Sequence, residues 1–365
     1  MGLKCGIVGL PNVGKSTLFN SLSSAKAQSA NFPFCTMEPN VGTINIPDPR
    51  LDELVAKVQP ENTVPNTIEI YDIAGLIKGA SKGEGVGNQF LANIRDVNAM
   101  IHVVRCFQDD NIVHVNNKVN PVADKEIIDT ELQLKDLEGI EKQIQKYQKV
   151  AKTGDKEAVK AMETLKLAQT HLESGQSLRS LELDEDGLQL LHRLQPLTIK
   201  PVLYVANVGE AEAASGNAFV EQLKDAIAGE GAEILVLSAK IEAEIAEIED
   251  TEERDEYLSM YDLKEPGVNK LIRKAYDLLD LITYFTAGKK EVRAWPIRKG
   301  TLAPQAAGVI HSDFERGFIK AEVIHYEDFM KYGSESACRE AGKLSMEGKE
   351  YEVKDGDVIH FKFNV

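Results

Sequence analysis

The sequence has few cysteines and no long apolar run. Its 365 residues include four scattered cysteines, Cys5, Cys35, Cys106 and Cys338, with no CxxC spacing among them. This argues against a disulfide framework or a zinc site and favours a reducing cytoplasm. Runs of about eighteen apolar residues are absent, so we expect no membrane-spanning helix. The short apolar start leads into a glycine-rich loop, so we also expect no signal peptide.

The sequence also has fewer basic than acidic residues. Lys and Arg number 42 against 58 Asp and Glu, which gives a formal net charge of −16. A protein that wraps nucleic acid over its whole surface needs a basic face, so this charge argues against that class and leaves room only for a local basic patch. Hydrophobic residues make up 43% and charged residues 27%, which is typical of a globular chain. The length allows two or three domains.

Short apolar strands alternate with helical segments over much of the chain. The expected strands are at residues 4–9, 67–73, 99–104, 201–206 and 234–237. This alternation predicts an α/β domain with a mostly parallel sheet and helices on both faces. We place this main domain at residues 1–126 and 199–280, which makes it discontinuous.

Two further regions follow other patterns. Between residues 127 and 198, apolar residues recur at helical spacing on both sides of a turn at 153–155, which predicts an inserted antiparallel helical hairpin. A pair of ordinary surface helices of the main domain is the alternative. Residues 281–365 carry short strand-like pieces punctuated by Gly, Asp and Pro, which predicts a small C-terminal α+β domain.

A phosphate-binding loop is the strongest motif. Residues 9–16, GLPNVGKS, match GxxxxGK[ST] at every fixed position, between an expected strand and an expected helix. Gly9 and Gly14 let backbone N–H groups face phosphate oxygens. Lys15 would reach the β- and γ-phosphates, and Ser16 would supply a hydroxyl to Mg²⁺. The remaining nucleotide contacts are predicted at neighbouring positions: Asn12, Val13 and Thr17.

Two later segments complete a predicted magnesium site. Asp72 and Gly75 fit DxxG at the end of an apolar strand, so Asp72 would hold Mg²⁺ through water and the Gly75 amide would reach the γ-phosphate. Thr36 lies in a Pro-containing loop from which it could close on Mg²⁺ as a switch element. Many GTPases carry a water-orienting Gln directly after DxxG, but this chain has Leu76 there. Catalysis therefore needs another group.

Two groups could take that catalytic role. The Asn12 carbonyl could help to bind a monovalent cation such as K⁺ near the phosphates, where the cation would act electrostatically. His114, in the loop after the third expected strand, could reach the attacking water. A solvent-exposed loop histidine without a catalytic role is the alternative for His114.

The base-reading segment departs from the Asn-Lys-x-Asp pattern of guanine-binding proteins. Residues 207–210 read Asn-Val-Gly-Glu, so Val replaces Lys and Glu replaces Asp. The Asp of that pattern accepts from guanine N–H groups that adenine lacks, whereas Asn207 could bond adenine N6 and N7. We therefore expect ATP to be preferred, with guanine reading by Glu210 as the alternative. Three residues match the SAK loop that backs the base: Ser238, Ala239 and Lys240.

Motifs along essentially the whole chain resemble the Obg-like ATPase family, bacterial YchF type. They include GIVGLPNVGKSTLFN, NFPFCTMEPN, HVVRCF, ANVGE, EVRAW and GVIHSDFERGFIKAEV. The resemblance implies a TRAFAC-class P-loop NTPase of GTPase-like fold with a helical insertion and a C-terminal TGS domain. It also implies ATP hydrolysis exceeding GTP hydrolysis, binding to the ribosome or its large subunit, and links to translation and oxidative stress.

The same resemblance assigns residues to the base site. Asn207 and Val208 would contact adenine, and Phe107 would border it. Leu76 fits the family's hydrophobic replacement of the catalytic Gln. Gly209 departs from the bulkier polar residue that bacterial relatives often carry, which could loosen selectivity without reversing it.

A local basic patch is predicted near the hairpin turn. Lys142, Lys146 and Lys149 share one helical face and could contact rRNA. The alternative is a solvated face balanced by neighbouring glutamates. Cys35, beside Thr36, is a candidate redox-sensitive thiol. We expect a monomer because no heptad seam extends beyond the hairpin. Three functions stay open: an ATP-driven ribosomal switch, a GTPase of the same fold, and a ribosome-binding adaptor whose nucleotide is structural.

Overall fold

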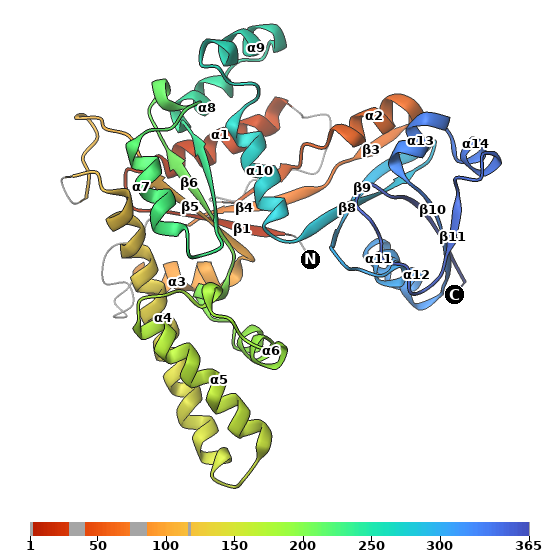
Figure 1. Cartoon of the computed structure of the whole chain (residues 1–365). Helices are drawn as coiled ribbons and strands as arrows, with labels where there is room; N and C mark the ends of the chain where they lie inside the picture. The colour runs from red at the N-terminus through yellow and green to blue at the C-terminus, as the bar shows by residue number, and fades with distance from the viewer. Residues whose placement is uncertain (1–2, 29–40, 74–85, 116–117, 365) are drawn as a thin grey trace. The chain divides into compact units, whose positions relative to one another are not determined.

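The computed structural model describes most of the chain (Figure 1). The described residues are 3–28, 41–73, 86–115 and 118–364. They divide into two compact units, the first formed by residues up to 43 and residues 69–271, the second by residues 44–68 and 272–364. Within these ranges no helix is long and apolar enough to cross a membrane.

The first unit is built on a largely parallel sheet with the strand order β2-β4-β1-β5-β6-β7. Its strands are β1 (Lys4–Val8), β2 (Val41–Asn45), β4 (Thr67–Asp72), β5 (Ala99–Arg105), β6 (Val202–Asn207) and β7 (Glu233–Leu237). The pairs β1–β4, β1–β5, β5–β6 and β6–β7 are parallel. The central strands β5 and β6 are buried along their whole length, as in sheets covered on both faces. The predicted α/β fold class is confirmed.

Helices flank this sheet on both sides (Figure 1). They are α1 (Lys15–Gln28), α3 (Val86–Asp96), α7 (Ala218–Ile227), α8 (Ala239–Ile245) and α10 (Gly267–Asp277), while α9 (Thr251–Met260) packs on α8. Parallel pairing places the carboxyl ends of the strands at one edge of the sheet, so the loops that follow β1, β4, β5, β6 and β7 meet there. All the predicted nucleotide-binding segments that are described lie in these loops.

A long helical pair leaves the sheet between β5 and β6 (Figure 1). It consists of α4 (Pro121–Ala151) and α5 (Lys156–Glu173), joined by a turn in which Gly154 has φ 84°. The pair encloses an apolar core that includes Ile140 and Leu165, and α6 (Glu185–Leu194) adds to it. α4 begins earlier than the predicted bound at residue 127, because Asn120 caps its first turn and Pro121 has a fixed φ suited to the first helical position.

The first unit also contains short 3₁₀ turns, and a buried ion network joins the base of α4 to the sheet. The turns are η2 (Leu178–Ser180), η3 (Leu197–Ile199) and η4 (Glu210–Glu212). Lys125 of α4 lies 2.6 Å from Asp129 and 2.5 Å from Glu230. Glu230 also accepts hydrogen bonds from Arg179 (3.0 Å) and Tyr204 (2.9 Å). Because every charge here has a partner of opposite sign, the network satisfies the condition for burying ionic groups.

The second unit has a mixed sheet with the order β11-β10-β12-β8-β9-β3. The strands are β3 (Asn62–Val64), β8 (Leu281–Ala287), β9 (Glu291–Arg298), β10 (Phe318–Ile324), β11 (Ser345–Glu347) and β12 (Val358–Phe363). The pairs β8–β9 and β10–β12 are antiparallel, whereas β3–β9 and β8–β12 are parallel. The predicted C-terminal α+β domain is confirmed.

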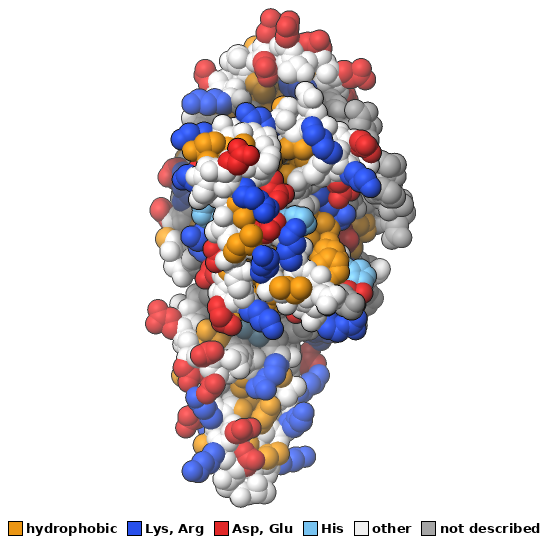
Figure 2. All heavy atoms as spheres, turned by 90° about the vertical axis from the view of Figure 1, so that its right-hand side faces the viewer, with side chains coloured by type: hydrophobic (Ala, Val, Ile, Leu, Met, Phe, Trp, Pro, Cys, Tyr) orange, Lys and Arg blue, Asp and Glu red, His pale blue; other side chains and the backbone are white. Residues whose placement is uncertain are grey.

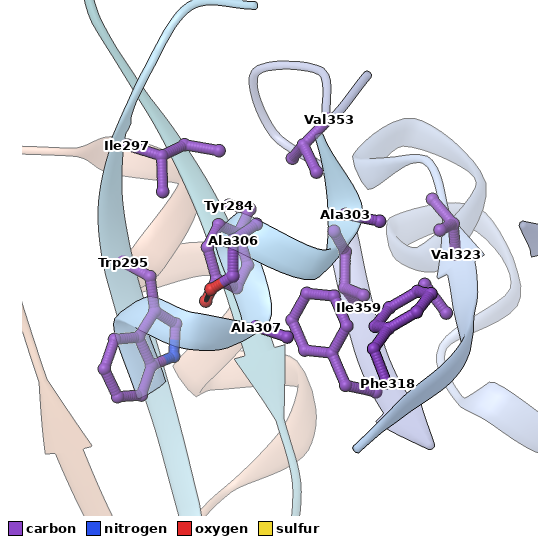
Figure 3. Packing of buried hydrophobic residues seen from close by; sticks show 12 residues of the cluster. Tyr284, Trp295, Ile297, Ala303, Ala306, Ala307, Phe318, Val323, Val353 and Ile359 are labelled. Carbon is purple, nitrogen blue, oxygen red and sulfur yellow. Dashed lines mark hydrogen bonds between the residues drawn. The ribbon is translucent and has the colours of Figure 1, made fainter. Parts of the chain in front are cut away.

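Both faces of this sheet are covered. On one face, Tyr284, Trp295, Phe318 and Ile359 pack against α11 (Ala303–Ile310), as Figure 3 shows. The other face packs against helices that also belong to this unit: α2 (Pro49–Val58), α13 (Tyr326–Tyr332) and α14 (Glu335–Glu340). A short helix, α12 (Ser312–Arg316), follows α11.

One segment lies elsewhere than the sequence prediction put it. We had assigned residues 44–68 to the main domain, but they belong to the second unit. Asn62–Val64 pairs with β9, and Leu54 of α2 is fully buried in the core beside Phe285. The cause is long-range: the segment pairs with a strand more than two hundred residues later in the chain (Asn62 with Glu291), which no local pattern reveals.

Candidate functional site

The phosphate-binding loop follows β1 and leads into α1. Asn12 and Gly14 have φ values of 63° and 90°, the left-handed region that turns successive N–H groups toward one side. A Cβ on Gly14 would collide with the side-chain amide of Asn207, so only glycine fits there. A Cβ on Gly9 would lie 2.7 Å from the carbonyl oxygen of Val103. The loop therefore has the shape of an anion-binding nest at a helix N-terminus.

Lys15 and Asp72 are brought together by strand register. Ile7 of β1 pairs with Asp72 at the end of β4, so the carboxylate lies beside the phosphate-binding loop. The Lys15 ammonium, which is 9% exposed, pairs directly with the Asp72 carboxylate. Ser16 is exposed at the start of α1. A nucleotide phosphate and a divalent cation carry the charges that could replace this pairing, phosphate on Lys15 and metal on Asp72, so the donor set fits Mg²⁺.

Asn207 is buried where β6 ends and joins two loops. Its Nδ2 donates to the carbonyl oxygen of Val13 at 2.8 Å, and its Oδ1 accepts from the N–H of Ala239 at 2.8 Å. The amide therefore ties the phosphate-binding loop to the loop before α8. An amide has a second N–H and a second lone pair. The predicted contact of Asn207 with adenine stays a prediction, and it must use these remaining sites.

The other predicted base contacts lie in the same region. Val208 and Ala239 are buried, and Val208 donates its N–H to the carbonyl oxygen of Leu237 at 2.9 Å. The Ser238 hydroxyl is buried and, within the described part of the chain, has no hydrogen-bond partner. Buried hydroxyls are nearly always bonded, so an unsatisfied one beside a binding loop fits a position where a ligand or water completes the contact.

Glu210 is paired with a lysine of the same loop cluster. Its Oε1 lies 2.9 Å from the Lys240 ammonium. The hydrogen bond to Glu210 is the largest cause that raises the pKa of Lys240 above its ordinary value. Sequence reasoning identified both positions but not their contact. In guanine-binding proteins the corresponding carboxylate is free to accept from the base, whereas here it already has a cationic partner.

The loop after β5 carries Phe107 and His114. Phe107 is half-buried, and the guanidinium of Arg105 lies 4.5 Å from its ring centre. His114 is 6% exposed, and its Nε2 lies 2.8 Å from Oδ2 of Asp124 in the first turn of α4. The alternative of a solvent-exposed histidine is therefore wrong. The contact with Asp124 engages one of the two ring nitrogens.

Asn12 also contacts this loop. Its Nδ2 donates to the carbonyl oxygen of Val113 at 3.1 Å. This hydrogen bond uses the side-chain nitrogen of Asn12. A K⁺ contact would use the side-chain oxygen, which this hydrogen bond does not involve. Thr17 is exposed beside Ser16. Four other predicted positions lie outside the described residues: Cys35, Thr36, Gly75 and Leu76.

Three cysteines are described, and all are buried. Burial raises the pKa of Cys5 and of Cys106 to about 12, which makes them inert thiols. Sequence reasoning missed Arg105 and Asp124. Arginine is rarely buried, so its place at the end of a largely apolar strand was the available signal for Arg105.

Comparisons with known proteins agree with this geometry. A family model described as "50S ribosome-binding GTPase" matches residues 4–148, and the YchF-GTPase_C model, described as "Protein of unknown function (DUF933)", matches residues 281–364. The chain is 54% identical to proteins named "Ribosome-binding ATPase YchF" from Escherichia coli O157:H7 and Bacillus subtilis, with 100% of each chain covered.

A solved structure matches as well. The structure of the Schizosaccharomyces pombe YchF GTPase superposes with a TM-score of 0.90 and 39% identity, and the match covers 99% of this chain and 98% of that one. With full-length identity of this order to several relatives and the same architecture, this chain belongs to the YchF family.

Proposed function

We propose that this protein is a Mg²⁺-dependent ATPase that prefers ATP to GTP and acts as a nucleotide-dependent switch on the ribosome or its large subunit, in translation or stress regulation. The two bacterial relatives named above carry the name ribosome-binding ATPase, and the base-reading segment of this chain differs from the guanine pattern. The observation that carries the proposal is the 2.9 Å pairing of Glu210 Oε1 with Lys240, because this cation competes with guanine for the carboxylate.

The residues around the phosphates would have separate roles in binding the metal and the phosphate groups. Ser16 and Asp72 would hold Mg²⁺, with Thr36 as a third contact, and bound Mg²⁺ would neutralise phosphate charge. Backbone N–H groups from Val13 onward would bind the phosphate oxygens. Lys15 would exchange Asp72 for the β- and γ-phosphates, so that its ammonium faces the charge that develops during hydrolysis. The Gly75 amide would add a contact to the γ-phosphate.

Two candidates remain for the group that replaces the missing Gln. A K⁺ ion on the Asn12 carbonyl would stabilise phosphate charge, and we expect faster turnover in K⁺ than in Na⁺. If His114 acts on the attacking water, His114→Ala lowers the turnover number at unchanged ATP affinity. Equal rates in both salts exclude the cation, and unchanged turnover in the variant excludes the histidine.

Calorimetric titration with ATP and with GTP, in the presence of Mg²⁺ and K⁺, tests the base preference. We expect clearly tighter binding of ATP. Equal or tighter binding of GTP would mean that Glu210 reads guanine and that the protein is a GTPase of the same fold. Lys15→Ala separates a switch from an adaptor with a structural nucleotide: a switch loses its biological effect when hydrolysis stops, and an adaptor keeps it.

The helical pair is the proposed contact to rRNA. Lys142 already pairs with Glu138 at 2.5 Å, whereas Lys146 and Lys149 form no ion pair among the described residues. Figure 2 shows basic and acidic side chains interleaved on this part of the molecule, so the positive surface is small. We therefore expect Lys146 and Lys149 to carry the contact and Lys142 to contribute little.

Charge reversal tests this contact. Lys146→Glu with Lys149→Glu should weaken ribosome association and lower the slope of log affinity against log salt by about one per lost phosphate contact. Lys224→Glu is the matched control, because Lys224 is an exposed helical lysine paired with Glu221 in another part of the unit. Equal effects of both variants would show that the helical pair is only a solvated face. The proposed switch is a monomer in the cytoplasm, where ribosomes are available.

A further inference from the structure

Arg105 is a buried cation bonded only to main-chain oxygens. It ends β5 and is 2% exposed. Its guanidinium donates from Nε to Phe107 O (3.2 Å), from Nη1 to Ile112 O (3.0 Å) and from Nη2 to Asp109 O (3.2 Å). Within the described ranges it forms no ion pair at bonding distance. The carboxylates of Asp109 and Asp124 act on its charge only through space, so the hydrogen bonds that a buried guanidinium needs go to these carbonyl groups.

The three carbonyl groups belong to one loop, residues 106–114. At its start, the Cys106 N–H donates to Asn207 O at 2.8 Å, which joins the loop to the base-reading segment. At its end, Val113 O accepts from Asn12 of the phosphate-binding loop at 3.1 Å. The loop therefore runs from the base side of the site to the phosphate side, and Arg105 lies inside it.

Phe107 is fixed by the same side chain. The Arg105 guanidinium lies 4.5 Å from the ring centre, within range of a cation–π contact, while its Nε bonds the carbonyl of the same residue. One planar group thus holds both the ring and the main chain of Phe107. A lysine ammonium cannot do this, because it has a single nitrogen and cannot stack as a plane while reaching three separate carbonyls.

We propose that Arg105 is a positioning residue, which shapes the 106–114 loop so that Phe107 is presented to the nucleotide base. The inference rests on the proposed ATP site, because it assigns the base as the partner of Phe107. Arg105 acts through the loop and makes no contact with substrate itself. Its effect is therefore confined to ligands that carry a base.

The first test compares ATP with inorganic tripolyphosphate, each with Mg²⁺, by calorimetry. Arg105→Lys should weaken ATP binding about tenfold, the equivalent of one good hydrogen-bonded contact, and should leave tripolyphosphate binding within about twofold. Arg179→Lys is the matched control: Arg179 is also buried and bonds Lys200 O at 3.2 Å, away from this loop. A parallel loss for both ligands, or an equal loss in the control, overturns the proposal.

A double-variant cycle tests whether Arg105 works through Phe107. If it does, Arg105→Lys combined with Phe107→Ala binds ATP no more than about twofold more weakly than the weaker single variant. Fully additive losses contradict the proposal. Should Arg105→Lys fail to fold, Phe107→Ala is the deciding variant, because Phe107 is only half-buried. If Phe107→Ala binds ATP as tightly as the wild-type protein, Phe107 makes no contact with the base and the proposal is overturned.

Hydrogen exchange separates this inference from the proposed function. In the nucleotide-free protein, Arg105→Lys should raise exchange of the 106–114 amides, and Arg179→Lys should not. Unchanged exchange in Arg105→Lys overturns the positioning role. Raised exchange together with tighter wild-type binding of GTP than ATP would keep the positioning role and reject the ATP preference.

Discussion

Replacing Asn207 should loosen two loops at once. Asn207→Ala leaves the Val13 carbonyl and the Ala239 N–H without their 2.8 Å partners in a buried place. Each unsatisfied buried group costs about 1–2 kcal/mol, so we expect a loss of about 2–4 kcal/mol in unfolding free energy. For a unit of this size, that lowers the melting temperature by roughly 5–15 °C.

Thermal unfolding of the nucleotide-free protein measures this loss, and ATP titration measures its effect on binding. Asn207→Asp is the informative second variant, because its carboxylate can still accept from Ala239 but faces the carbonyl oxygen of Val13 with no donor. It should therefore be at least as destabilised as the alanine variant at neutral pH. The account is refuted if Asn207→Ala melts and binds ATP like the wild-type protein.

Three further changes have defined outcomes. Lys240→Gln releases Glu210, so GTP affinity relative to ATP should rise, by no more than about fivefold because an exposed ion pair is weak; an unchanged ratio in competition titrations contradicts this. Lys125→Met leaves Asp129 buried without its cation, while Glu230 keeps Arg179, and should cost about 3 kcal/mol in urea unfolding; a loss below about 1 kcal/mol would show that the network is dispensable. Burial, and then the charges of Lys125 and Arg179, lower the pKa of His102 to about 3. Below pH 6.5, His102 is therefore protonated in the unfolded chain but stays neutral in the folded chain. Stability should therefore fall by about 2 kcal/mol between pH 7.5 and pH 5, and His102→Leu should lose that part of the dependence.

Local motifs predict the backbone shape of the proposed phosphate side of the site. GLPNVGKS specifies both its ligand and its backbone shape, and the structure has left-handed turns at Asn12 and Gly14 where that shape requires them. Asp72 was predicted from its place at a strand end, and parallel register with β1 then brings it to Lys15. Such information is local, so a single sequence reveals it.

Contacts between distant segments could not be predicted in the same way. The pairing of Glu210 with Lys240 depends on how two loops meet, and the burial of His114 depends on Asp124 in the next helix. Residues 44–68 were misplaced because their partner strand, Glu291–Arg298, lies far along the chain. Loop sequences carry no periodic signal from which such partners can be identified.

The preference for adenine is the central claim, and parallel calorimetric titrations of the wild-type protein with ATP and with GTP, with Mg²⁺ and K⁺ present, test it most directly. The account predicts clearly tighter binding of ATP, because Val208 replaces the Lys of the guanine motif and the Lys240 ammonium pairs with the Glu210 carboxylate. Equal or tighter binding of GTP would contradict it.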